Sequence, residues 1–116
     1  FVYVTDVAKA FFLAAKSKKS GQIYNLGSDN PQSVNKLANL IGGEKIFIPE
    51  RPGEPKKTWA NITKIKRDLK WSPKINFENG VNKMLGEIKN WKNAPLWTPN
   101  SIHIATKTWF KYMNKK

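Results

Sequence analysis

The chain contains no cysteine and only one histidine, His103. The lack of cysteine excludes disulfide bonds and thiolate metal sites, although it does not assign a redox compartment. A lone histidine cannot form the paired ligands of a metal site, and no cluster of acidic residues has the spacing to replace them. His103 lies on the flank of an apolar helical pattern, where an ordinary surface position is favoured over catalysis. We therefore expect no metal centre and no catalytic histidine.

Long apolar runs and the common catalytic sequence motifs are also absent. No segment reaches the length needed to span a bilayer, and no charged-then-apolar start suggests a signal peptide, so we expect a cytoplasmic protein without a membrane partner. There is no G-x-G-x-x-G, no P-loop and no G-x-S-x-G sequence. By itself, the chain is not predicted to be an enzyme or to bind a cofactor.

Positive charge is plentiful: 21 lysines and arginines against eight acidic residues give a formal net charge of +13. A basic surface attracts phosphate-bearing partners, so one hypothesis is a non-enzymatic module that binds nucleic acid with an affinity that falls steeply with salt. The lysines are scattered, however, and Arg51 and Arg67 are the only arginines. Trp71, Trp91 and Trp109 lie at helix ends or on apolar stripes, which favours core packing over base stacking. Nucleic-acid binding is therefore the less favoured alternative.

The apolar pattern predicts an α+β fold, a small domain of short strands and about five helices. The 116 residues, 40% of them hydrophobic, suffice for one compact domain, and we expect either one domain or one piece of a domain. We expect strands at about 1–4, 22–28 and 44–49, and helices at about 7–16, 34–41, 62–69, 77–91 and 99–113. The side chains expected to be buried by these helices are Val7, Ala10, Phe11, Ala14, Ala15, Val34, Leu37, Ala38, Ile41, Ile62, Ile65, Leu69, Val81, Met84, Leu85, Ile88, Trp91, Ile102, Ala105, Trp109 and Met113.

The segment "IPERPGEPKKTW", residues 48–59, combines three prolines and a glycine around Arg51. Proline removes backbone freedom, so little ordering entropy would be lost if Arg51 bound a ligand. A guanidinium suits a phosphate or diphosphate, and the carboxylate of Glu54 suits sugar hydroxyls. These residues alone fit equally well a stiff surface turn in which Arg51 pairs with Glu50 or Glu54.

Four segments in order resemble one known family: "FVYVTDVAKA", "GQIYNLGSDNPQSVNKLANLIGG", "IPERPGEPKKTWANITKIKRDLKWSPK" and "INFENGV". They are similar to the carboxy-terminal portion of the extended short-chain dehydrogenases/reductases, the NAD-dependent nucleotide-sugar epimerases and dehydratases, with UDP-glucose 4-epimerase as the nearest type. The resemblance covers residues 1 to about 85, and the tail is typical of only some members. It implies a nucleotide-sugar-binding domain over 1–90 and a helical extension over 91–116.

The resemblance also implies roles and partners. The arginine of the family's R-P-G-D/E loop contacts the nucleotide diphosphate and the acid three residues later contacts the ribose, which assigns substrate binding to Arg51 and Glu54. NAD would be bound by an amino-terminal Rossmann domain of the full-length enzyme, which would also carry the Tyr-x-x-x-Lys pair. A UDP-sugar is the expected substrate, and we expect the full-length enzyme to be a homodimer. Because the chain starts at Phe1 inside a β-like run, we expect it to be the downstream part of a longer protein.

Two positions depart from the family pattern. Asn61 replaces an aspartate before "ITK", and either residue can cap a helix. Lys70 replaces the glycine of the usual "L-G-W" sequence. A left-handed residue at that position would be strained by about 1 kcal/mol without glycine.

Overall fold

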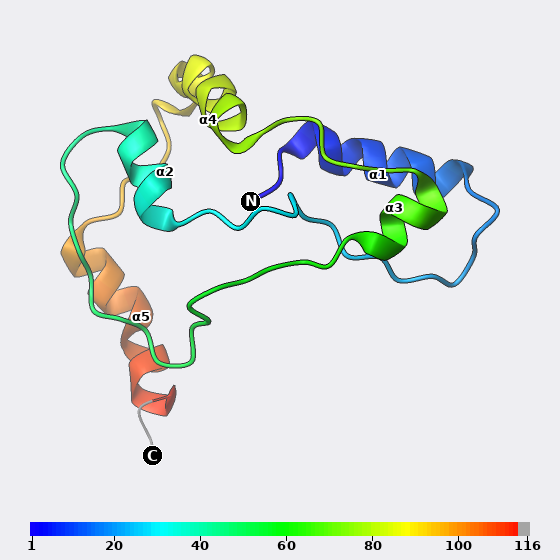
Figure 1. Ribbon diagram of the computed structural model, residues 1–116. Coiled ribbons are helices and arrows are strands. Elements are labelled where there is room, and N and C mark those ends of the chain that lie inside the picture. The colour runs from blue at the N-terminus through cyan, green and yellow to red at the C-terminus, as the bar shows by residue number, and fades with distance from the viewer. Residues whose placement is uncertain (114–116) are drawn as a thin grey trace.

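The computed structural model describes residues 1–113, and these residues form helices joined by long irregular segments (Figure 1). The elements in chain order are α1 (Val4–Lys16), α2 (Val34–Ile41), α3 (Thr63–Leu69), α4 (Phe77–Gly86), the 3-10 helix η1 (Ile88–Trp91) and α5 (Pro99–Met113). The five predicted helices are thus confirmed. The predicted tail 91–116 ends in residues that lie outside the described part of the chain.

The three predicted strands are not found among residues 1–113, so the β part of the predicted α+β class is not confirmed. At the first strand, α1 begins three residues earlier than predicted, because the backbone N–H groups of Asp6 and Val7 donate to the carbonyl of Tyr3 at 3.0 and 3.2 Å. The segments 22–28 and 44–49 are irregular. A strand requires a neighbouring backbone to complete its hydrogen-bond ladder, and no described segment supplies one.

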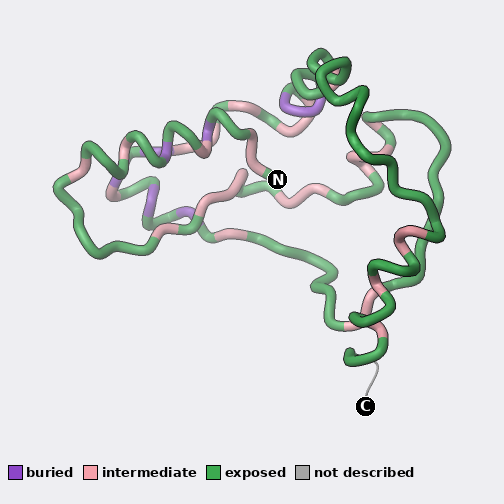
Figure 2. Tube along the Cα trace, turned by 180° about the vertical axis from the view of Figure 1, so that it is seen from behind, coloured by how far each residue is buried: buried purple, intermediate pink, exposed green. Residues whose placement is uncertain are grey.

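The buried core lies between α1 and the segment that contains α3. It consists of Ala10, Ile62, Ile65, Leu69 and Trp71. The stripe predicted for α3 and the burial predicted for Trp71 are confirmed. Figure 2 shows that buried residues occur only in these elements and in one part of α4, which contributes Gly80 and Val81.

Asp6 joins α1 to the chain that follows α3. Its side chain is 95% buried, and its Oδ2 accepts hydrogen bonds from the backbone N–H groups of Lys74 and Ile75 at 3.0 and 2.9 Å. The indole Nε1 of Trp71 donates to the Asp6 carbonyl at 2.9 Å. A buried carboxylate must be hydrogen-bonded to be tolerated, and here each bond crosses more than 60 residues of sequence. Asp6 therefore fixes the position of the segment that leads into α4.

Polar side chains cap several helix N-termini. Ser33 accepts from Lys36 N at 3.0 Å, Asn76 from Asn79 N at 2.8 Å and Thr98 from Ser101 N at 3.2 Å.

The helix predicted over 77–91 is divided, because α4 ends at Gly86 and a 3-10 turn follows.

Several side chains that were predicted to be buried are exposed. Phe11 is 69% exposed, Trp91 56% and Trp109 43%, and α5 contains no buried residue. The periodic pattern correctly indicates helices, but burial needs a second apolar surface to cover each stripe, and only the stripe of α3 is fully covered.

The whole chain is open rather than compact. Its accessible surface is 9831 Å², whereas a compact protein of 13.3 kDa exposes about 6,400 Å². Its radius of gyration is 17.9 Å, compared with about 13 Å for a compact domain of this length. Residues 1–113 are therefore more extended than a compact domain of the same length. No described helix combines the length and the apolar character needed to cross a membrane.

Candidate functional site

The segment between α2 and α3 carries the predicted site residues on a tight turn. The backbone N–H of Glu54 donates to the carbonyl of Arg51 at 3.2 Å, which closes a four-residue β-turn. Pro52 and Gly53 occupy its two central positions, and Gly53 has a φ of +78°. Proline followed by a residue with positive φ is typical of a type II turn, in which glycine avoids a steric penalty. The local sequence thus determines this conformation.

Arg51 and Glu54 are paired with one another across the turn. Arg51 Nε lies 2.9 Å from Glu54 Oε2, and Arg51 Nη2 lies 2.7 Å from Glu54 Oε1. This is the bidentate geometry in which a guanidinium is most selective for carboxylate or phosphate. The two side chains keep 35% and 45% of their surface exposed, so solvent reaches the pair. Arg51 Nη1 has no hydrogen-bond partner within residues 1–113.

The ion pair alters the titration of both groups. The hydrogen bonds from Arg51 lower the pKa of Glu54 below its ordinary value of 4.5, and those to Glu54 raise the pKa of Arg51. Both side chains therefore remain charged throughout the neutral pH range. Since the guanidinium already has an anionic partner, an incoming anion must displace Glu54 or use the remaining donors of Arg51.

Helix α5 covers one side of this turn. The indole Nε1 of Trp109 donates to the carbonyl of Pro52 at 2.8 Å, and the guanidinium carbon of Arg51 lies 5.5 Å from the centroid of the Trp109 ring. The apolar pattern of the helix predicted Trp109 to be a core residue and gave no indication of this contact. Its 57-residue separation from Pro52 gives no local signal, because only the path of the chain brings the two together.

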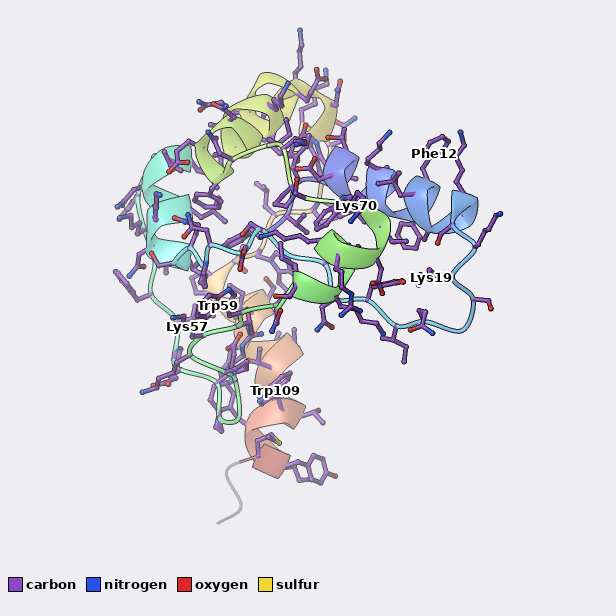
Figure 3. All side chains as sticks on the ribbon, turned by 45° about the vertical axis from the view of Figure 1, so that its right-hand side comes forward. Phe12, Lys19, Lys57, Trp59, Lys70 and Trp109 are labelled. Carbon is purple, nitrogen blue, oxygen red and sulfur yellow. The ribbon has the colours of Figure 1, made fainter. Side chains whose placement is uncertain are left out.

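Two hollows lie away from the turn. One, of about 440 Å³, is almost entirely apolar and lies between the first residues, α2, α4 and η1, with Leu37, Phe77 and Trp91 among its walls. The other, of about 410 Å³, is more polar and includes Asp29 and Trp59. Figure 3 shows Trp59 and Trp109 on different parts of the chain. Neither hollow is indicated by the sequence, since both are formed by segments distant along the chain.

Other candidate chemistry is limited. His103 lies exposed on α5, and residues 1–113 contain no group of three or more histidines and carboxylates able to hold a metal ion. The same residues form neither a parallel sheet nor a glycine-rich turn at a helix start, which are the features that hold a dinucleotide.

The model of the GDP-mannose 4,6 dehydratase family matches residues 1–84. The chain belongs to this family, which places it among the extended short-chain dehydrogenase/reductase epimerases and dehydratases, and it corresponds to part of their carboxy-terminal region. The resemblance deduced from the four sequence segments is thereby confirmed.

Individual relatives are similar along most of the chain. A Methanocaldococcus jannaschii protein provisionally named a UDP-glucose 4-epimerase is 35% identical over 96 residues, which cover 78% of this chain and 30% of the relative. A UDP-glucuronate 4-epimerase of Thermodesulfobacterium geofontis is 31% identical over 111 residues, 90% of this chain and 33% of the relative. A dTDP-glucose 4,6-dehydratase of Escherichia coli is 26% identical over 126 residues, 96% of this chain and 34% of the relative.

The chain thus spans about a third of the length of these relatives. No solved structure matches it significantly.

Proposed function

We propose that this chain is the nucleotide-sugar-binding region of an NAD-dependent epimerase or dehydratase, in which Arg51 contacts the diphosphate and Glu54 contacts the ribose. The pairing of Arg51 with Glu54 is also what a stiff surface turn shows. The observation that carries the proposal is that the proline-stiffened turn holding this pair forms the R-P-G-E loop of a chain that belongs to the family. The pair holds a guanidinium and a carboxylate side by side at the surface. A nucleoside diphosphate requires one donor for phosphate and one acceptor for ribose, and this turn supplies both.

Binding would exchange partners within the pair. A phosphate oxygen pair has nearly the geometry of the Glu54 carboxylate, so it can replace that carboxylate at the guanidinium. Glu54 would then be free to accept hydrogen bonds from the ribose hydroxyls. Like charge would separate Glu54 from the phosphates, which favours this arrangement over one in which both anions share Arg51.

The upstream region of the full-length enzyme would supply the redox chemistry. NAD bound there would supply the hydride-transfer chemistry. The residues of this chain would bind and orient the nucleotide, and they take no part in proton or hydride transfer.

The proposal also includes a UDP-sugar as the substrate and a homodimeric full-length enzyme. Within this chain, residues 1–90 would bind the nucleotide sugar and residues 91–116 would form a helical extension.

The test is a calorimetric titration with UDP and UDP-glucose, using the chain alone and the chain joined to an upstream cofactor domain. Arg51→Ala should weaken UDP binding roughly tenfold or more, because charged hydrogen bonds contribute about 1.5–3 kcal/mol. Arg67→Ala is the matched control. Arg67 is the other arginine and is also paired with a carboxylate, that of Asp68, at 2.7 Å.

Arg67→Ala should leave the UDP affinity within about twofold, the scale of a surface charge change. Equal losses in the two variants would contradict a specific diphosphate contact. If the chain joined to the cofactor domain binds neither UDP nor UDP-glucose at millimolar concentration, the proposal is excluded.

A further inference from the structure

Helix α5 contacts the Arg51 turn and makes few other contacts with distant parts of the described chain. None of its 15 residues is buried, so it is not anchored in the core between α1 and α3. Its main contacts with a distant part of the chain are those of Trp109 with Arg51 and Pro52, and of Met113 with Gly53. The position of α5 and that of the turn therefore depend on one another.

The hydrogen bond of Trp109 acts on the backbone of the turn. The Pro52 carbonyl belongs to the peptide group that leads into Gly53, so its orientation determines the turn conformation. The indole N–H fixes this carbonyl at 2.8 Å. The side chains of Arg51 and Glu54 lie on either side of this peptide group, so its orientation sets their positions relative to each other.

The ring of Trp109 acts on the guanidinium. A cation lies against the face of an aromatic ring, whereas the N–H donors of a guanidinium lie in its own plane. Contact with Trp109 can therefore restrain Arg51 while its donors stay available to an acceptor. Trp109 is itself 43% exposed, which shows that it is not simply a core residue.

Gly53 completes the contact. Its positive φ disfavours any other residue, and Cε of Met113, the flexible end of a side chain of α5, lies against it. Glycine is thus required by the turn, and it leaves room for Met113. Three separate contacts, of different chemistry, join one helix to one turn.

We propose that α5 is a clamp that holds the Arg51–Glu54 turn in its diphosphate-binding geometry, with Trp109 as the positioning residue. The proposal rests on the function proposed above. Since the clamp and the ligand would act on the same guanidinium, nucleotide binding and α5 docking would strengthen each other by the same factor.

The test follows the Nε–H signals of arginine by nuclear magnetic resonance in the 116-residue chain. Only Arg51 and Arg67 contribute, and both Nε atoms donate to carboxylates, so Arg67 is an internal reference. Without ligand, Trp109→Ala should shift the Arg51 signal and speed its exchange with water, while the Arg67 signal stays unchanged. Trp109→Phe keeps a ring beside Arg51 and loses the N–H donor, so its effect should be intermediate.

Trp97→Ala is the control, because Trp97 is 70% exposed and makes none of these contacts. It should alter neither signal. An Arg51 signal that is the same in Trp109→Ala and in Trp97→Ala would overturn the clamp. So would unfolding of the α1–α3 core in Trp109→Ala, shown by loss of the Arg67 reference.

UDP then separates the two proposals. In the native chain, UDP should shift the Arg51 signal. Trp109→Ala should weaken UDP binding roughly threefold to fivefold, the fold-change that matches an exposed cation–π contact. If UDP leaves Arg51 unmoved although Trp109→Ala disturbs it, the diphosphate assignment fails while α5 still positions the turn. If UDP binds equally well to the native chain and to Trp109→Ala, α5 has no role in ligand binding.

Discussion

Lys70 ends α3 in a conformation that its side chain does not favour. Its φ is 53° and its ψ is 28°, in the left-handed region that was predicted for this position. Its side chain is exposed, so no buried contact compensates for the strain. The residue connects the α3 stripe to Trp71 in the core, and the left-handed turn is what redirects the chain there.

Replacing Lys70 with glycine should therefore stabilise the chain. We expect Lys70→Gly to raise the free energy of unfolding by about 0.5 to 1 kcal/mol, because glycine adopts positive φ without a steric penalty. Urea denaturation followed by tryptophan fluorescence measures the change. Lys83→Gly is the control: it places glycine inside α4 and should cost about 1 kcal/mol. A loss of stability in both variants would show that Lys70 carries no strain.

At the scale of elements, α2 and α4 are joined by one ion pair. Lys36 Nζ lies 2.5 Å from Glu78 Oε1, and the same ammonium lies 5.5 Å from the centroid of the Phe77 ring. The hydrogen bond from Lys36 lowers the pKa of Glu78 below its ordinary value of 4.5. The pair is nearly half exposed, so its net contribution is small and screened by salt.

The lowered pKa of Glu78 predicts how this contact responds to acid. The pair stabilises the docking of α2 on α4 fully above the ordinary pKa of 4.5, and the contribution is lost as the pH falls through the lowered pKa. Nuclear Overhauser contacts between the two helices should weaken over that range. Glu78→Gln should show the weaker contacts already at pH 7 and change less on acidification.

Glu44→Gln removes an exposed carboxylate outside this contact and should keep the pH dependence of the native chain. Contacts between α2 and α4 that weaken identically in both variants would contradict the role of the ion pair.

The whole molecule exposes much more apolar surface than a compact protein. Val34, Phe47, Leu96 and Trp97 are each at least 70% exposed, and the hollow beside α2 and α4 is lined almost entirely by apolar side chains. Because so little of the chain is buried, we infer that the hydrophobic contribution to its stability is small.

An apolar dye should therefore bind the native chain. Nile red is suitable because it is uncharged and is not attracted by the net charge of +13. Ile88→Glu, in the wall of the 440 Å³ hollow, should lower its fluorescence strongly. Ile104→Glu, on α5 and similarly exposed at 64% against 59%, should lower it little. Equal effects of Ile88→Glu and Ile104→Glu would mean that the dye binds exposed apolar surface in general and not the hollow.

Local chemistry made much of this structure predictable. Ser33, Asn76 and Thr98 are helix caps because their side chains reach nearby N–H groups, and each cap depends on only a few residues. Long-range contacts were not predictable in this way. Asp6 accepts hydrogen bonds from residues 68 and 69 positions away, and no periodicity indicates such a partner. The predicted strands failed for the same reason, since a strand requires a second backbone.

By itself, the sequence determined the helices, their caps, the proline-stiffened turn at Arg51 and the family to which the chain belongs, because each depends on neighbouring residues or on collinear motifs. Only the tertiary structure decided that Trp109 lies against the turn at Arg51, that Asp6 is buried, and that most apolar stripes stay uncovered. These outcomes depend on which distant segments meet, and burial and hydrogen bonding at such meetings are not encoded in any local pattern.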